Sequence, residues 1–214
     1  MKYKCIIFDC DGVLVDSEAI SSQVLVDMIS ELGSDLRLND AIAEFSGKSF
    51  NSIVTYIDER IDGNIPADFE KKFRERTFES FQNHLEPIKG IHELLEKLTT
   101  PFCVASSGPR DKIILNLTKT GLIHKFPEKN IFSCYDIGSW KPEPYVYLYA
   151  AKQMGFEPKD CVVIEDSTYG ITAAVSGGFD TFAYAKAHEK ERFKEIGAIK
   201  IFDDMVQLHA LLSK

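Results

Sequence analysis

The chain has 214 residues, of which 44% are hydrophobic and 27% are charged, a balance typical of a globular protein with a buried core. Its net charge of −8 argues against a nucleic-acid partner, because phosphate backbones select basic surfaces. No stretch approaches the ~20 apolar residues of a membrane-spanning helix, and the apolar run near the N-terminus is too short for a signal peptide, so we expect a cytoplasmic protein with no membrane partner.

The first predicted element is a short strand over residues 4–8, whose apolar side chains are typical of a strand buried on both faces. It ends at Asp9-Cys10-Asp11-Gly12, which places two carboxylates two residues apart. A calcium-binding EF-hand loop would need glycine at its sixth position, whereas Gly12 stands at the fourth. A solvated acidic turn remains an open alternative to a functional site.

The next segment, residues 17–84, has a helical pattern and no convincing strand. Asp16 or Ser17 can cap a first helix, which Gly33 would end. A second helical stretch surrounds Ile53 and Ile57, and a third begins near Pro66. We therefore predict an all-helical domain, residues 17–84, inserted into an α/β core formed by residues 1–16 and 85–214.

The chain returns to the core near Gly90, and the predicted elements then alternate. A helix that includes Ile91 and Leu98 precedes a strand over residues 102–105, and further strands are predicted over residues 161–164, 181–184 and 199–202. Strands that alternate with helices predict a doubly wound, mainly parallel sheet covered on both faces. Ligands bind such sheets beyond the carboxyl ends of the strands, where polar side chains follow three of these runs.

These polar side chains suggest metal and phosphate chemistry. Glu165 and Asp166 follow the strand at 161–164, and carboxylates gathered at a sheet edge repel one another unless a cation neutralises them. Oxygen ligands favour a hard ion such as Mg²⁺. Ser106 follows the strand at 102–105, and Lys141 lies in a segment with prolines that hold its backbone away from helix. Taken singly, these residues could be helix-capping groups or a surface lysine.

Five cysteines, an odd number without C-x-x-C spacing, argue against a disulfide or zinc framework. We expect them to be free, and most of them to be buried as small hydrophobic side chains. They are Cys5, Cys10, Cys103, Cys134 and Cys161.

The ordered set of motifs resembles the haloacid dehalogenase (HAD) superfamily over essentially the whole chain. The motifs are Asp-x-Asp-Gly-Val-Leu-Val-Asp-Ser-Glu, a strand followed by Ser, Lys-Pro-x-Pro, and Glu-Asp-Ser-x-x-Gly. The chain is similar to the subfamily with a helical cap inserted after the first strand, which includes β-phosphoglucomutase and sugar-phosphate phosphatases. The stretch 134–144 resembles the bacterial 6-phosphogluconate phosphatase type.

The resemblance implies a role for each matching residue. Asp9 matches the nucleophile that forms an aspartyl-phosphate, and Asp11 matches the general acid/base. Magnesium would be held by Asp9, Asp166 and the backbone carbonyl of Asp11, with Glu165 in or near its coordination shell. Phosphate would be bound by the side chains of Ser106 and Lys141 and by the amide of Ser107.

The resemblance also places substrate recognition in the cap. Its substrate loop matches residues 45–49, where Lys48 is a candidate contact to an anionic substrate and Gly47 could supply a tight turn. Two departures stand out. The loop reads Ser139-Trp140-Lys141, where members often have glycine before the lysine, and Ser21 lies where many mutase-like members have histidine.

We therefore predict a monomeric, magnesium-dependent phosphatase that hydrolyses a small phosphorylated metabolite, either a sugar phosphate or a phosphorylated sugar acid such as 6-phosphogluconate. A β-phosphoglucomutase-like mutase is the main alternative, although Ser21 weakens it. Asp11 speaks against a dehalogenase, since those relatives lack the second acid. Dehydrating or phosphonate-cleaving enzymes and a non-catalytic binding module are the remaining alternatives.

Overall fold

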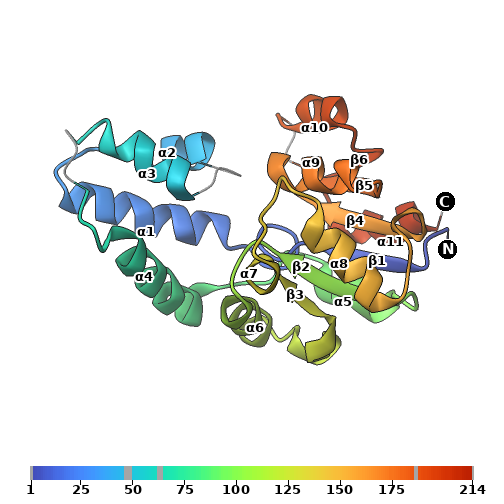
Figure 1. The fold of residues 1–214 in the computed structure, drawn as a ribbon. Coiled ribbons are helices and arrows are strands. Elements are labelled where there is room, and N and C mark those ends of the chain that lie inside the picture. The colour runs from blue at the N-terminus through green and yellow to red at the C-terminus, as the bar shows by residue number, and fades with distance from the viewer. Residues whose placement is uncertain (1, 46–49, 62–64, 186–187, 214) are drawn as a thin grey trace. The chain divides into compact units, whose positions relative to one another are not determined.

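A computed structural model describes residues 2–45, 50–61, 65–185 and 188–213. The chain forms two compact units (Figure 1). One contains residues 1–15 and 86–214, and the other contains residues 16–85. Among the described helices, none is long and apolar enough to cross a membrane.

The first unit is built on a six-stranded parallel sheet with the order β3-β2-β1-β4-β5-β6. The strands are β1 (Cys5–Phe8), β2 (Phe102–Ser106), β3 (Ile131–Ser133), β4 (Cys161–Glu165), β5 (Asp180–Tyr184) and β6 (Lys200–Phe202). Five of them confirm predicted strands. β3 was not predicted, because its apolar run is only Ile131-Phe132, whereas β6 lies in the four-residue run Ile199-Lys200-Ile201-Phe202.

Helices cover both faces of the sheet, because successive side chains of its central strands point to opposite sides. On one face, Ile7 and Val163 pack against α8 (Tyr145–Met154) and α9 (Thr168–Ser176). The alternate residues Ile6, Phe8 and Ile164 are also fully buried. The predicted fold class, a doubly wound α/β core, is therefore confirmed.

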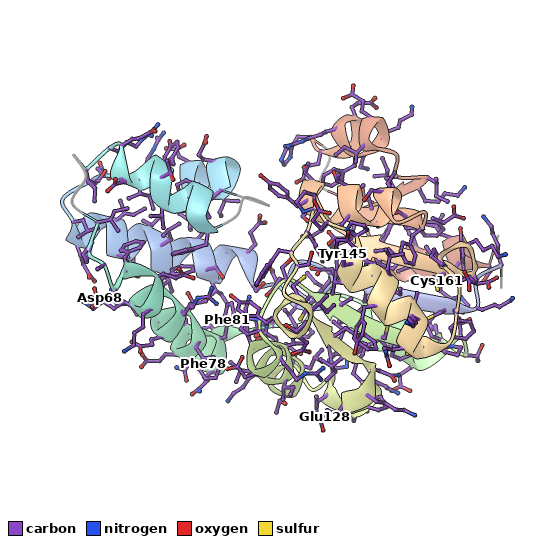
Figure 2. The ribbon with its side chains drawn as sticks, viewed as in Figure 1. Asp68, Phe78, Phe81, Glu128, Tyr145 and Cys161 are labelled. Atoms are coloured by element: carbon purple, nitrogen blue, oxygen red, sulfur yellow. The ribbon has the colours of Figure 1, made fainter. Side chains whose placement is uncertain are left out.

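The remaining helices of this unit fill the crossovers between strands. They are α5 (Ile91–Lys97), α6 (Arg110–Lys119), α7 (Cys134–Ile137), α10 (Lys190–Ile196) and α11 (Met205–Leu212), with short 3₁₀ turns at Ile123–Lys125, Glu128–Asn130 and Pro158–Asp160. α11 packs against α5 and β6. All five cysteines are free and buried, as predicted; Figure 2 labels Cys161 at the start of β4.

The second unit contains only helices among its described residues. They are α1 (Glu18–Glu31), α2 (Leu38–Phe45), α3 (Phe50–Asp58) and α4 (Phe69–His84). Val24 and Met28 of α1 join Phe45, Ile57 and Phe69 in a separate hydrophobic core. Three helices match the predicted pattern, whereas α2 was not predicted. Ser17 occupies the N-cap position of α1, but its hydroxyl makes no capping hydrogen bond.

A matched pair of substitutions on α11 tests the core of the α/β unit. Leu208 is fully buried, whereas Val206 on the same helix is 50% exposed. We expect Leu208→Ala to lower the free energy of unfolding by about 2–5 kcal/mol, because it removes buried methyl groups and leaves a cavity. Val206→Ala should change it by no more than about 0.5 kcal/mol. Urea unfolding followed by Trp140 fluorescence measures both, and equal effects would contradict the assigned packing.

Candidate active site

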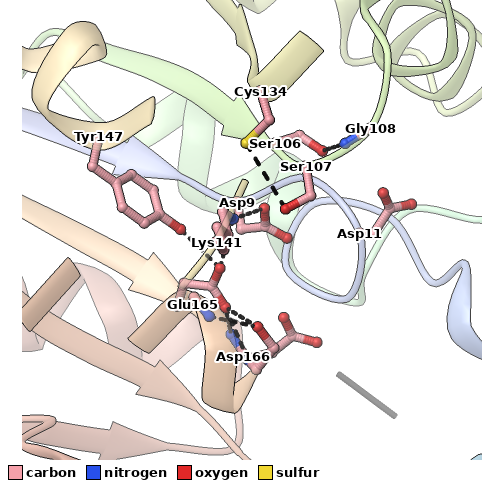
Figure 3. A network of polar contacts seen from close by, with 12 residues as sticks. Asp9, Asp11, Ser106, Ser107, Gly108, Cys134, Lys141, Tyr147, Glu165 and Asp166 are labelled. Carbon is pink, nitrogen blue, oxygen red and sulfur yellow. Dashed lines mark hydrogen bonds and ion pairs between the residues drawn. The ribbon is translucent and has the colours of Figure 1, made fainter. Parts of the chain in front are cut away.

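The predicted site residues meet at the carboxyl edge of the sheet, where three neighbouring strands end. Asp9 follows β1, Ser106 is the last residue of β2 and Glu165 is the last residue of β4. Since Phe8 of β1 is in register with Val104 and Ile164 on either side, the parallel pairing brings these ends together. Figure 3 shows the resulting network of polar contacts. The expected convergence of three strand ends is therefore present.

Lys141 joins two of these strand ends through one buried ammonium group. It reaches the sheet from the loop after α7, and its side chain is only 5% exposed. Its Nζ donates hydrogen bonds to Oδ1 of Asp9 at 2.5 Å and to Oε1 of Glu165 at 2.7 Å. The Tyr147 ring centroid lies 4.8 Å from the same Nζ. Lys141 is therefore a buried cation shared by two carboxylates, which rules out the surface-lysine alternative.

The Glu165 carboxylate is fully buried, and both of its oxygens accept hydrogen bonds. Oε1 accepts from Lys141 and from the hydroxyl of Tyr147, at 2.7 and 2.8 Å. Oε2 accepts from the backbone amides of Asp166 and Ser167 and from the Ser167 hydroxyl, at 2.8, 2.9 and 3.0 Å. A Cβ at Gly170 would overlap this carboxylate, so the glycine leaves the room that it needs. Glu165 is thus already saturated with protein donors.

Burial and charge act in opposite directions on these groups. Burial raises the pKa of Asp9 to about 7, although the charge of Lys141 opposes the shift. Burial also favours the neutral form of Glu165, but the charge and hydrogen bond of Lys141 outweigh it and lower the pKa of Glu165. For Lys141, burial is outweighed by the charges of Asp9 and Glu165, so its pKa stays well above the usual value. Lys141 and Glu165 therefore form a stable ion pair.

Carboxylate oxygens of Asp9, Glu165 and Asp166 lie within 4.8 Å of one another, and they form the only such cluster of potential metal ligands among the described residues. Asp166 is partly exposed, unlike the other two. A Cβ at Gly12 would overlap the Asp166 carboxylate, so the turn after β1 leaves space for it. Gly12 also has a φ of 85°, which favours glycine. The oxygen-only ligand set suits a hard divalent cation such as Mg²⁺.

The end of β2 and the loop after it present Ser106 and Ser107 near these carboxylates (Figure 3). Ser106 is buried, and its Oγ accepts a hydrogen bond from the amide of Gly108 at 3.1 Å. Ser133 fixes the same loop by donating from Oγ to the carbonyl of Gly108 at 2.7 Å. Ser107 accepts a weak hydrogen bond from the Cys134 thiol at 4.0 Å. Ser106 is not a helix N-cap, because α6 begins only at Arg110, with Pro109 as its N-cap.

Asp11 faces α6 rather than the buried ion pair. Its Oδ2 accepts a hydrogen bond from Lys112 at 2.9 Å, and its Oδ1 accepts one from Asn116 at 3.2 Å. Burial opposes the charge on Lys112, but the neighbouring Asp11 carboxylate outweighs it and raises the pKa of Lys112. The sequence prediction included neither Lys112 nor Asn116.

Tyr147 is the third residue that sequence reasoning missed. A phenol hydroxyl within an apolar helix needs a buried partner, and this need was the available signal. For Lys112 and Asn116, the signal was their spacing of four residues, which places them on one face of α6. The predicted substrate contacts Gly47 and Lys48 lie outside the described residues.

Comparison with known proteins identifies the family. The haloacid dehalogenase-like hydrolases match residues 6–184. The chain belongs to this family. It is 34% identical to 6-phosphogluconate phosphatase of Escherichia coli over 191 residues, which cover 88% of this chain and 86% of that protein. The family and its phosphatases confirm the predicted enzyme class, a HAD-type phosphomonoester hydrolase.

Two solved structures are similar to this chain over nearly its whole length. A haloacid dehalogenase-like protein of unknown function from Agrobacterium tumefaciens has a TM-score of 0.90 and 30% identity, covering 99% of this chain and 98% of that one. A HAD family hydrolase from Deinococcus radiodurans R1, with bound phosphate and sodium, has a TM-score of 0.84 and 29% identity, covering 99% and 96%.

Replacing Lys141 tests the buried ion pair through its pH dependence. In Lys141→Met, Asp9 and Glu165 lose their cation, so the pKa of Asp9 rises further above its unfolded value and the lowered pKa of Glu165 rises as well. Such groups bind protons in the folded state, and their cost to stability therefore grows as pH rises. We expect a loss of about 3–5 kcal/mol near pH 8 that shrinks toward pH 5, measured by urea unfolding in EDTA.

The control is Lys125→Met, since Lys125 pairs at 2.6 Å with Glu96, whose side chain is 65% exposed. This variant should show no comparable pH-dependent loss, because solvent screens the Glu96 charge. A loss in Lys141→Met that is the same at pH 5 and pH 8 would contradict the coupling between Lys141 and the two carboxylates.

Proposed function

We propose that the protein is a Mg²⁺-dependent phosphatase that transfers the phosphoryl group of a small phosphomonoester to Asp9 and then to water. The observation that carries the proposal is the position of the Asp9 carboxylate at the end of the central strand, within 2.5 Å of a buried ammonium and beside the Asp166 carboxylate. Phosphoryl transfer depends mainly on positioning and on stabilising charge, and these groups supply both.

In the first half-reaction, a carboxylate oxygen of Asp9 attacks phosphorus. The new P–O bond forms as the bond to the leaving oxygen breaks, and Asp11 gives its proton to that oxygen. In the second half-reaction, Asp11 takes a proton from water, which attacks the aspartyl-phosphate. Inorganic phosphate leaves, and the Asp9 carboxylate is regenerated.

The loop after β2 and Lys141 would bind the phosphoryl oxygens. The hydroxyl of Ser106, the amide of Ser107 and the ammonium of Lys141 are hydrogen-bond donors from two sides of the sheet edge. Their positive charge and dipoles offset the repulsion that an acidic protein exerts on a phosphate group. The loop Ser139-Trp140-Lys141 lacks the more usual glycine before the lysine, yet Lys141 still reaches Asp9.

The metal would be held by the side chains of Asp9 and Asp166 and by the backbone carbonyl of Asp11. Glu165 has a different role in this proposal, because five protein donors already bind its two oxygens. It anchors Lys141 and the start of α9 from outside the inner coordination shell. When bound, Mg²⁺ neutralises charge on the phosphoryl oxygens.

We further propose that residues 17–84 act as a cap that selects the substrate, as implied by the family. A phosphorylated sugar acid, such as 6-phosphogluconate, is the favoured substrate class. It is supported by the 34% identity to a protein named for that reaction and by Lys48, a cation suited to a second anionic group. A monomeric state and a cytoplasmic location remain predictions from the sequence.

Phosphate release over a panel of sugar phosphates, sugar-acid phosphates and nucleotides tests the reaction. We expect turnover that Asp9→Asn lowers by at least about 10⁴-fold, because the amide cannot act as the nucleophile. The matched control Asp203→Asn, in an exposed ion pair with Lys190, should keep wild-type activity. Undiminished turnover in Asp9→Asn would refute the proposed nucleophile. Interconversion of sugar 1- and 6-phosphates with little free phosphate would instead show a mutase.

The assignment of metal ligands predicts unequal effects of two neighbouring carboxylates. EDTA should abolish turnover and added Mg²⁺ should restore it. Asp166→Asn should raise the Mg²⁺ concentration for half-maximal activity by about 100-fold or more, because it removes a proposed ligand, and loss of an outer-shell partner alone costs about 10–100-fold. Glu165→Gln should lower kcat with a smaller change in that concentration. A larger Mg²⁺ shift for Glu165→Gln would show that Glu165 binds the metal directly.

A further inference from the structure

Two side chains of α6 hold the carboxylate of Asp11 from one side. Lys112 and Asn116 are four residues apart, so they lie on the same face of the helix. Lys112 Nζ lies 2.9 Å from Oδ2 of Asp11, and Asn116 Nδ2 lies 3.2 Å from Oδ1. Each carboxylate oxygen therefore has its own donor. We call this pair of donors the α6 clamp.

The burial of Asn116 indicates that the clamp does not exist for stability alone. Asn116 is fully buried, and within the described part of the chain its Oδ1 has no hydrogen-bond partner. An apolar residue there would avoid this desolvation penalty of ~1–3 kcal/mol. Rotating the amide would not help, because it would turn an oxygen toward the Asp11 carboxylate. The amide therefore donates to Asp11 while its own oxygen is left without a partner among the described residues.

The clamp also separates Asp11 from the other carboxylates of the site. Figure 3 shows the Asp11 carboxylate apart from the contacts that join Lys141, Asp9 and Glu165. Asp9 and Glu165 share the ammonium of Lys141, whereas Asp11 has the ammonium of Lys112. The two acids that lie two residues apart in the sequence are therefore held by different cations on different elements.

We propose that Lys112 and Asn116 are positioning residues for Asp11 that support its proton transfer to the leaving oxygen. The inference rests on the proposed function of Asp11 as the general acid. As the O–H bond of Asp11 breaks and the proton moves to the leaving oxygen, its electron pair stays on a carboxylate that the clamp already binds. The two hydrogen bonds fix the carboxylate orientation and stabilise the charge that this step creates.

The dependence of the rate on the leaving group tests this role. p-Nitrophenolate is a good leaving group that departs without a proton, whereas an alkoxide needs one. The value of kcat/KM reports the steps up to departure of the leaving group and excludes the later attack of water. We therefore compare kcat/KM for p-nitrophenyl phosphate with kcat/KM for the best alkyl phosphate of the panel.

In Lys112→Met, we expect kcat/KM for the alkyl phosphate to fall by about 100-fold, within the range of general acid catalysis. The value for p-nitrophenyl phosphate should fall less than about 3-fold. Asn116→Leu should also lower kcat/KM for the alkyl phosphate selectively, but by a smaller factor. Lys112→Arg should keep part of the rate that Lys112→Met loses. Asp11→Asn should give the largest loss of kcat/KM that removing the clamp can cause. Lys119→Met, an exposed position on the same helix, is the control and should match the wild type.

The ratio of kcat/KM for the two substrates distinguishes a lost clamp from partial unfolding, because unfolding lowers both kcat/KM values by the same factor. An equal fall for both substrates, or none for either, would overturn the clamp while leaving the phosphatase proposal intact. A shared rise in KM would show that Lys112 binds phosphate instead, which also overturns it. By contrast, wild-type protein without turnover on either substrate, or full activity in Asp9→Asn, would overturn the proposed function itself.

Discussion

One buried ammonium group holds together the two most deeply buried carboxylates of the site, Asp9 and Glu165. Lys141 is nearly excluded from solvent and lies between Asp9 and Glu165. Its single ammonium group pairs with both buried carboxylates. Without this cation, two acids at adjacent strand ends would repel each other in a medium of low dielectric constant. Their arrangement is stable because the loop after α7 delivers Lys141 to the edge of the sheet.

The two carboxylates that share Lys141 differ in their other hydrogen bonds and in the direction of their pKa shifts. Glu165 also accepts hydrogen bonds from Tyr147, from the Ser167 hydroxyl and from two backbone amides, although the charge and hydrogen bond of Lys141 do most to lower its pKa against burial. Burial raises the pKa of Asp9 to about 7, although the charge of Lys141 opposes the shift. The same lysine therefore faces one carboxylate with a lowered pKa and one with a raised pKa.

The backbone matters as much as the charges, because the carboxylates need space that only glycine leaves. Gly12 and Gly170 stand where a Cβ would overlap Asp166 and Glu165 respectively. α6 contributes from a third direction by presenting Lys112 and Asn116 to Asp11. An acidic chain can thus gather four carboxylates at one sheet edge, because two lysines and a set of backbone and side-chain donors are brought there by different crossovers.

The sequence by itself determined the alternation of strands and helices, the parallel sheet, and the residues at the ends of its strands, because buried strands and motif spacing are local features. It missed β3 and the helices α2, α7, α8, α10 and α11, and it missed Lys112, Asn116 and Tyr147. These three side chains act on residues that are distant in the chain: Asp11 lies 101 positions from Lys112 and 105 from Asn116. Only the tertiary structure decided which cation serves which acid, because that choice depends on how crossover helices pack over the sheet.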